Sequence, residues 1–361
     1  MLAKKVFTPG PTQVPPEVLK AVVSSITYHR SRDFKEFHKN FVQKLKQIFL
    51  TEHNLSVLTS SGTGAMEAAV VNFCSPGDNV LFFNQGKFGA RWGAICRAYG
   101  LNAAEIHKDY GNAVQTSDLK DADLSSTSAI FLTHSETSTA TLTDIRRISE
   151  YIRANSDALI AVDAITSIGA IEFRMDEWGI DIAVSASQKG LMTPPGLSVI
   201  AYSEKAKSKM IKSTMPRFYF DLRKEIKSFE DGLTMWTPAV GLFYGLDKAC
   251  DIILNEGLEN KWKRVHGMAE YFRNESLKNG FGILSKSPSD SMTAVTLPDN
   301  IPTGRIISAL KEKYGIQIAN GKDELRDKIA RVSHMGDLEL SDFVELSKLI
   351  RQEFTAIKEH D

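Results

Sequence analysis

The chain has 361 residues, of which 42% are hydrophobic and 24% are charged, and its 44 basic residues balance its 44 acidic ones. This composition is that of an ordinary globular protein, and the balanced charge favours neither nucleic acid nor a membrane surface as a partner. The length suits one large domain and one smaller one, because single cores stop growing at roughly 250 to 300 residues.

Cysteine usage and the first residues bear on the compartment. Cys74, Cys96 and Cys250 show no C-x-x-C spacing, so neither a structural zinc site nor a disulfide framework is predicted. We therefore expect no metal and a reducing compartment, the cytoplasm. The N-terminal residues reach prolines before any apolar run of signal-peptide length, and no window approaches the roughly 20 apolar residues of a membrane helix.

Between residues 54 and 202, short apolar runs rich in β-branched residues alternate with amphipathic stretches. The strand candidates are residues 55–60, 79–84, 129–136, 158–165, 181–187 and 197–203, and the helix candidates are 64–74, 88–100 and 144–156. Because the strand candidates are almost continuously apolar, we predict an α/β fold with a mostly parallel sheet buried on both faces. In such sheets the functional residues lie just beyond the carboxyl ends of the strands.

Beyond about residue 255 the pattern changes. Helical stretches at 260–280 and 304–315 surround short strand candidates at 292–298, 316–320 and 329–334, which predicts a smaller α+β domain. We therefore divide the chain into an N-terminal arm (1–15), a large domain (16–255) and a small C-terminal domain (256–361).

The first strand candidate ends in a loop of small residues, Ser61-Gly62-Thr63, that opens a helix. Free N–H groups at a helix N-terminus, two hydroxyl groups and a glycine that permits close approach form a cradle suited to phosphate. The loop lacks the lysine of a Walker A motif and the third glycine of a dinucleotide fingerprint. An ordinary helix cap with a tight turn is the alternative.

Two charged residues follow later apolar strands. Asp163 ends the run at 158–165, where a carboxylate either caps the strand end or faces a cationic group of a bound cofactor. Lys189 follows small residues and precedes Thr193–Gly196, a rigid loop; most lysines are solvated, but this setting suits a Schiff base with an aldehyde. A phosphate cradle, an aspartate and a Schiff-base lysine on successive strand ends together predict a pyridoxal 5′-phosphate (PLP) site.

Several motifs give the chain a resemblance to class V aminotransferases of fold type I, in the alanine–glyoxylate and serine–pyruvate branch. They are FTPGPTQVPPEVLKAV (7–22), YHRSRDF (28–34), SSGTGAMEAAV (60–70), LTHSETSTATL (132–142), VDAITSIGA (162–170) and SASQKGLMTPPGLSVI (185–200), the last being the most specific. The resemblance covers nearly the whole chain. It implies a large PLP-binding domain with a mixed sheet flanked by helices and a smaller α+β domain.

The implied reaction moves an amino group from a small donor, alanine or serine, to glyoxylate or pyruvate. It follows a ping-pong mechanism through an aldimine at Lys189, which also moves the proton between the substrate Cα and C4′, while Asp163 keeps the pyridine nitrogen protonated. The other implied cofactor contacts are Ser61, Gly62, Thr63 and Gln188 at the phosphate, Phe88 on the ring and Thr137 near the 3′-oxygen. His134 and Glu136 either join this set or order the loop, and Trp92 is expected in the core.

Substrate and subunit contacts are implied as well. Arg331 matches the arginine that grips the amino acid carboxylate, and Gly10 lets the N-terminal segment approach that carboxylate. Thr237 matches a position that completes the phosphate site of the partner subunit, with Thr234 a weaker match, so a homodimer is implied.

Other activities stay open from the sequence. Arg217, Arg223 and Lys224 either recognise a second acidic group, as in 2-aminoethylphosphonate or a dicarboxylate donor, or form a solvated charged loop. A lyase of the cysteine desulfurase type needs a cysteine on a mobile loop near the site, and none lies in the C-terminal region. A binding protein without turnover would normally lack the lysine or carry a DNA-binding domain.

Overall fold

In the computed structural model, which describes residues 4–24, 26–298 and 301–360, seven strands form a large mixed sheet. Its order is β2 (Asn54–Leu58), β10 (Ser198–Tyr202), β9 (Ile182–Ala186), β8 (Leu159–Asp163), β5 (Ala129–Thr133), β3 (Asn79–Asn84) and β4 (Asn102–His107). Among these strands, β10 alone runs in the opposite direction to the other six. The predicted α/β fold with a mixed sheet flanked by helices is confirmed.

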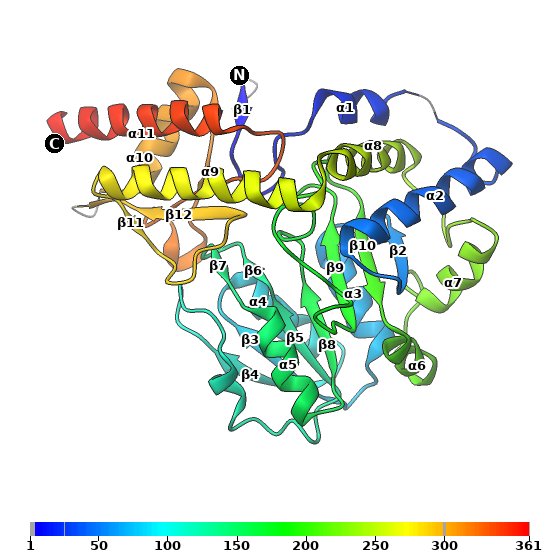
Figure 1. Cartoon of the computed structure of the whole chain (residues 1–361). Coiled ribbons are helices and arrows are strands. Elements are labelled where there is room, and N and C mark those ends of the chain that lie inside the picture. The colour runs from blue at the N-terminus through cyan, green and yellow to red at the C-terminus, as the bar shows by residue number, and fades with distance from the viewer. Residues whose placement is uncertain (1–3, 25, 299–300, 361) are drawn as a thin grey trace.

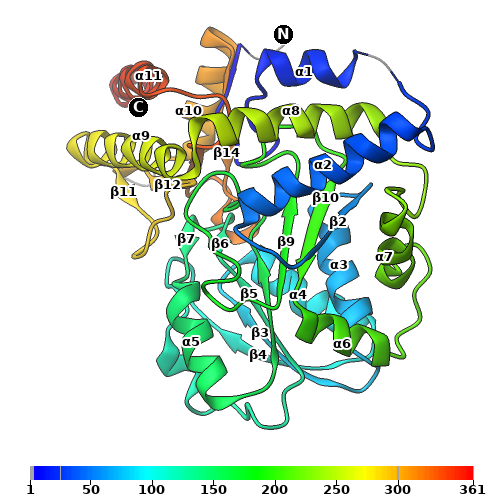
Figure 2. The same ribbon diagram turned by 45° about the vertical axis from the view of Figure 1, so that its right-hand side comes forward.

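Helices cover both faces of this sheet (Figures 1 and 2). One face packs against α2 (Arg32–Phe49), α5 (Ile145–Asn155) and α8 (Val240–Glu256), and the other against α3 (Gly62–Phe73), α4 (Lys87–Ala98), α6 (Glu204–Lys212) and the start of α7 (Leu222–Glu230). Within β8, Ile160 and Val162 enter the first core and Leu159 and Ala161 the second. This alternation explains the continuously apolar strands, because side chains of successive residues point to opposite faces.

The C-terminal elements gather at one end of the molecule (Figure 1). Of the described strands, β11 (Gly282–Ile283), β12 (Met292–Thr296), β15 (Ala330–Ser333) and β14 (Ala319–Asn320) form an antiparallel sheet. The helices there are α9 (Leu258–Lys278), α10 (Thr303–Ala309) and α11 (Leu340–His360), with short turns η3 (Leu310–Tyr314) and η4 (Asp323–Leu325). These elements enclose an apolar core of their own.

The N-terminal arm joins this C-terminal region although the two are far apart in the sequence. Strand β1 (Lys5–Val6) pairs in parallel with β13 (Ile316–Gln317), and the chain then passes through α1 (Pro16–Val22) to the large sheet. We retain the proposed division at 1–15, 16–255 and 256–361, since the α8–α9 junction at Gly257 separates the two sheets. Residues 1–3, 25, 299–300 and 361 of these ranges lie outside the described residues.

Some elements differ from the sequence prediction. Strand β4 was not predicted, because it lies at the edge of the sheet and four of its six residues are exposed, so it lacks an apolar run. The predicted strand at 316–320 is divided between β13, which pairs with β1, and β14, which pairs with β15. The remaining short elements are β6 (Ser135–Glu136), β7 (Thr141–Leu142) and η1 (Thr116–Leu119).

Within the described ranges, no helix combines the length and the apolar character that crossing a membrane requires.

Candidate functional site

Lys189 lies in the turn after β9, and the N-terminal arm crosses directly over it. The Lys189 Nζ donates a hydrogen bond to the Pro9 carbonyl at 2.6 Å. Thr12 reinforces this contact, because its N–H donates to the Gln188 carbonyl at 3.1 Å and its hydroxyl to the Lys189 carbonyl at 3.0 Å. Gly10 has a φ of +141°, and a Cβ there would come within 2.5 Å of Lys189 Cδ, Cε and Nζ. Glycine is therefore required for the arm to cover the lysine.

The loop after Lys189 is closed by its own hydrogen bonds. The Ser187 hydroxyl donates to the Pro194 carbonyl at 2.8 Å and accepts from Leu197 N at 3.3 Å, while Thr193 N donates to the Ser187 carbonyl at 2.8 Å. Because these bonds join both ends of the loop, Lys189 stands on a fixed backbone. The rigidity that the Thr-Pro-Pro-Gly sequence predicts thus has a structural basis in Ser187 as well as in the prolines.

Asp163 ends β8 and is only 4% exposed. One carboxylate oxygen accepts a hydrogen bond from Ile165 N at 2.9 Å. Burial raises the pKa of Asp163 to about 7, and the nearby charge of Glu136 acts in the same direction, while the charges of Lys189 and Arg91 oppose them. A cationic N–H group brought against this carboxylate would relieve its desolvation, so the site suits a pyridinium nitrogen.

The loop at the start of α3 keeps polar groups available. Ser61 is the N-cap residue, yet its side chain makes no capping hydrogen bond in the described structure. Gly62 packs so closely on the strand ends that a Cβ would lie 2.5 Å from Ile165 Cδ1. Gln188, on the neighbouring loop, has a buried amide oxygen with no partner among the described residues. The predicted phosphate residues thus include polar groups without a partner in the described chain, as a cofactor site requires.

Arg91, which the sequence argument missed, connects two predicted cofactor residues. Its Nη1 donates to the Thr63 hydroxyl at 2.9 Å, and its guanidinium carbon lies 4.7 Å from the centroid of the Phe88 ring. Phe88 and Arg91 are three residues apart in α4 and therefore share one face of the helix. The three-residue spacing from Phe88 was the signal in the sequence that could have revealed Arg91. The contact with Thr63 places a positive charge beside the proposed phosphate site.

The contacts of Glu136 and His134 indicate a structural role for both residues. The Glu136 carboxylate accepts hydrogen bonds from Phe88 N at 3.1 Å and Gly89 N at 2.9 Å, so it holds the loop against the start of α4. The His134 ring is buried, with Phe173 and Trp178 each 5.7 Å away between centroids, and burial lowers its pKa to about 3. His134 is therefore neutral, and the interpretation that these residues order the loop is the better supported one.

Trp92 lies in the core, as expected. It is fully buried, its Nε1 donates to the Leu132 carbonyl at 3.2 Å, and its ring packs 4.8 Å from that of Phe131. It fixes α4 to the sheet, and so supports the position of Phe88 one turn earlier.

Arg331 brings the C-terminal sheet to the site. It is buried in β15, where its Nε and Nη2 donate to the Asn320 carbonyl at 2.9 and 2.8 Å and its Nη1 donates to the Thr137 carbonyl at 3.1 Å. Three of its five N–H bonds are used in this way, which leaves one on each terminal nitrogen. Burial lowers the pKa of Arg331 to about 10, so it stays charged at neutral pH.

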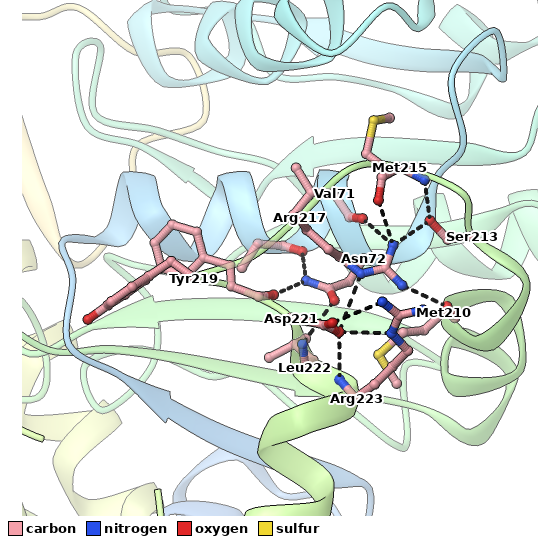
Figure 3. A network of polar contacts seen from close by, with 12 residues as sticks. Val71, Asn72, Met210, Ser213, Met215, Arg217, Tyr219, Asp221, Leu222 and Arg223 are labelled. Atoms are coloured by element: carbon pink, nitrogen blue, oxygen red, sulfur yellow. Dashed lines mark hydrogen bonds and ion pairs between the residues drawn. The ribbon is translucent and has the colours of Figure 1, made fainter. Parts of the chain in front are cut away.

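In the stretch 215–224, Arg223 and Lys224 are exposed, as the solvated interpretation predicts, whereas Arg217 is not. Figure 3 shows the Arg217 guanidinium directed into a cage of main-chain oxygens, and its side chain is 1% exposed. It donates to the carbonyls of Val71 at 2.9 Å and Met210 at 3.1 Å. Arg223 makes a bidentate ion pair with Asp221, at 2.8 and 2.9 Å. Both arginines are thus engaged within the chain, which leaves them poorly suited to a substrate.

Lys224 and the 234–237 segment lie nearby. The Lys224 amine is 4.5 Å from the Phe218 ring centroid. The Thr234 hydroxyl donates to the Trp236 carbonyl at 2.6 Å, so it is used locally, and the buried Glu225 accepts from Met235 N at 2.8 Å. Thr237 is exposed in the single chain.

The described residues contain no group of three or more histidine, cysteine, aspartate or glutamate side chains arranged to hold a metal ion.

A half-buried lysine on a fixed loop, a buried aspartate and a helix start with polar groups left unpaired in the described chain, all at the strand ends of a mixed sheet, define the class of α/β enzymes that carry PLP. The chain belongs to the class V aminotransferase family, whose sequence profile matches residues 6–334. This family is PLP-dependent.

Two relatives and a solved structure support this assignment. A protein of Synechococcus sp. (strain PCC 6716) named soluble hydrogenase, small subunit, is 38% identical over 334 residues, covering 91% of this chain and 87% of that protein. The L-aspartate–glyoxylate aminotransferase of Paracoccus denitrificans is 35% identical over 342 residues, covering 92% and 86%. The solved structure of alanine–glyoxylate aminotransferase from Nostoc sp. matches with a TM-score of 0.94 at 28% identity, over 98% of this chain and 96% of that one.

The pKa of Asp163 predicts a stability effect. Since the folded pKa is about 7 against an ordinary 3.8, the stabilising contribution of this group is complete below about pH 4 and is lost as the pH rises through 7. Asp163→Asn cannot ionise, so the cofactor-free variant should melt at a higher temperature than the unsubstituted protein at pH 8, and the gap should close near pH 4. Thermal unfolding measures this, with the exposed Asp157→Asn as control. A cofactor-free variant that melts lower at pH 8 would contradict it.

The pKa of Lys189 predicts the pH dependence of its reaction with an aldehyde. Burial lowers this pKa from the usual 10.5 to about 8, and only the neutral amine is nucleophilic. The rate at which cofactor-free protein attaches PLP should therefore rise with pH around a midpoint near 8. Stopped-flow absorbance gives the rate, and Lys189→Ala should lack the phase. A midpoint close to that of an ordinary lysine would show that the amine is not desolvated.

Proposed function

We propose that this aminotransferase moves an amino group from a small amino acid, alanine or serine, to glyoxylate or pyruvate. The observation that carries the proposal is the buried Lys189 amine, which lies under the N-terminal arm and interacts electrostatically with both Asp163 and Arg331. An amine that is partly neutral at physiological pH, an acid for a ring nitrogen and an arginine for a carboxylate are the three groups that amino transfer on PLP needs.

The residues that would hold the cofactor follow from their surroundings. Ser61, Gly62, Thr63 and Gln188 would bind the phosphate, Phe88 would cover the ring and Thr137 would lie near the 3′-oxygen. Asp163 would bind the ring nitrogen, with Lys189 attached at the aldehyde carbon. When bound, PLP supplies an electron sink that stabilises the carbanion left when the substrate loses its Cα proton.

Once the amino group of the substrate has replaced Lys189 at the aldehyde carbon, the free Lys189 amine would act as the base. Hydrogen bonds within its loop fix the backbone of Lys189, and its Nζ lies against the Pro9 carbonyl of the N-terminal arm. The amine would take the proton from the substrate Cα and deliver it to C4′ of the cofactor. A pKa near 8 suits this work, because a general base and acid is most effective when its pKa is close to the working pH.

Arg331 would orient both substrates. The remaining N–H bond on each terminal nitrogen would bind one oxygen of a carboxylate, an arrangement that lysine cannot reproduce. Donor and acceptor both carry a carboxylate beside the reacting carbon, so one arginine would serve both halves of a ping-pong cycle. Gly10 would allow the arm to stay close to that carboxylate.

Features of the chain support a homodimer, in which Thr237 completes the phosphate site of the partner subunit. Large apolar side chains are exposed in two segments, among them Val23 (79%), Ile26 (86%) and Phe218 (71%). Exposed apolar surface of this kind usually marks an interface. Thr237 is exposed in the single chain and could therefore reach a neighbouring subunit.

The lyase alternative has little support, because Cys74, Cys96 and Cys250 are all buried and such a lyase needs an accessible thiol. Their reduced state suits the cytoplasm, which we propose as the location. The name of the Paracoccus relative includes L-aspartate, so acidic donors belong in any substrate panel.

The amino donor can be identified by spectroscopy. The purified protein with PLP should show a visible band that alanine or serine bleaches and that glyoxylate or pyruvate restores. Aspartate and 2-aminoethylphosphonate complete the panel. Lys189→Ala should lose multiple-turnover activity, because the proton carrier is gone, yet still bind PLP through the phosphate loop. Normal turnover in that variant would refute the mechanism, and a band that no donor changes would refute the proposed reaction.

The position of Thr237 can be tested by mixing variants. Thr237→Ala should weaken PLP binding about tenfold, as loss of a hydrogen bond to a charged group predicts. If Thr237 serves the partner, a mixed dimer of Thr237→Ala and Lys189→Ala contains one intact site. Mixing under exchange should therefore raise the activity per Lys189-bearing subunit at low PLP above that of Thr237→Ala alone. If Thr237 serves its own subunit, the mixture gains nothing.

A further inference from the structure

A short loop between β14 and η4 carries Lys322. The residue two positions before it, Asn320, accepts both hydrogen bonds from the Nε and Nη2 of Arg331. The residue after it, Asp323, forms an ion pair at 2.7 Å with Lys87, the first residue of α4. Lys322 is thus held between the arginine proposed to bind the substrate and the helix that carries Phe88.

The Lys322 amine has no hydrogen-bond or ion-pair partner in the part of the chain that the structure describes. Its immediate neighbour Asp323 is occupied by Lys87. Burial and then the charges of Arg331, Lys87 and Arg91 lower the pKa of Lys322, and the charge of Asp323 opposes them.

The charge of Lys322 also acts on Lys189, the lysine proposed to react. The positive charge of Lys322 lowers the pKa of Lys189, after burial and together with the charge of Arg331. The contacts of Asn320 with Arg331 and of Asp323 with Lys87 place the backbone of this loop beside both cations.

The acids near these cations are fewer than the cations themselves. Asp163 and Glu136 are buried, and Asp323 is paired with Lys87. Lys189, Lys322, Arg331 and Arg91 are the remaining cationic groups that influence one another there. Cationic groups are therefore in excess beside Lys322, which attracts anions.

We propose that Lys322 binds the side-chain carboxylate of an acidic amino donor, such as aspartate, while Arg331 binds its α-carboxylate. This inference rests on the proposed function and adds a donor class to it. A donor with one carboxylate would leave Lys322 solvated, so alanine and serine would still react. The role matches the second acidic group considered for Arg217 and Arg223, whose guanidinium groups are engaged elsewhere.

The test compares Lys322→Gln and Lys322→Arg with the unsubstituted PLP-loaded enzyme. For Lys322→Gln, kcat/KM for aspartate should fall about tenfold through KM, with alanine and serine unchanged. Lys322→Arg should retain most of the aspartate activity, because the charge remains. The unsubstituted enzyme should lose its preference for aspartate as salt is added, since the amine is exposed to solvent.

A binding measurement separates recognition from turnover. Succinate and butyrate are unreactive acids with two carboxylates and one, and calorimetry gives their affinities for the PLP-loaded enzyme. Lys322→Gln should weaken succinate about tenfold and leave butyrate unchanged. Arg331→Ala should weaken both. The matched control is Lys311→Gln, which removes an exposed lysine of the C-terminal region that has no partner among the described residues.

The outcomes separate the two proposals. Unchanged aspartate kinetics and succinate affinity in Lys322→Gln would overturn the inference. An equal loss for all donors would also overturn it, since Lys322 would then act through the field at Lys189. An unsubstituted enzyme that uses alanine or serine but not aspartate would overturn the inference and leave the proposed function standing, whereas an enzyme that no donor bleaches would overturn both.

Discussion

The desolvation of Lys189 is the constraint on which the rest of the site depends. An amine that loses its water in the folded state needs compensation, and here the Pro9 carbonyl provides it. That contact requires the arm to pass over the lysine, which requires glycine at position 10. It also requires the arm to be anchored, and the pairing of β1 with β13 does so. A property of one nitrogen atom therefore determines the path of a segment nearly 180 residues away in the sequence.

Lys189 and Asp163 both have pKa values shifted toward their neutral forms. Each shift costs folding stability, because the unfolded chain would hold the charged form more easily. The large sheet can tolerate this loss of stability, because the apolar side chains that fill both of its faces stabilise the fold. A bound cofactor would supply a positive ring nitrogen to Asp163 and so return part of that stability. The stability of the fold and the chemistry of the site thus oppose one another until the cofactor is present.

The sequence predicted the strands near the site well, because each is a short apolar run followed by small or polar residues, and strands β3, β5, β8 and β9 all end at the same edge. It did not predict β4, whose exposed edge position removes the apolar pattern. It missed Arg91 because a helical arginine is normally solvated, and only the packing of α3 beside α4 brings it to Thr63. The carbonyl groups that bind Arg217 come together only in the tertiary structure, so the sequence does not reveal which arginine they bind. The solvated interpretation of Arg217 was wrong for this reason.

The site also depends on the meeting of three separate parts of the chain. The large sheet supplies Lys189 and Asp163, the C-terminal sheet supplies Arg331, and the arm covers the lysine. Arg331 itself bridges two of them, since Asn320 lies in β14 of the C-terminal sheet and Thr137 in the turn after β6 of the large domain. Because no local segment contains these contacts, the site can form only after the long-range structure is complete. With the roles proposed above for Arg331 and Lys322, a change in the C-terminal region would alter which amino donors are accepted while Lys189 and its loop stay unchanged. The range of donors would then vary more easily in this chain than the chemistry at Lys189.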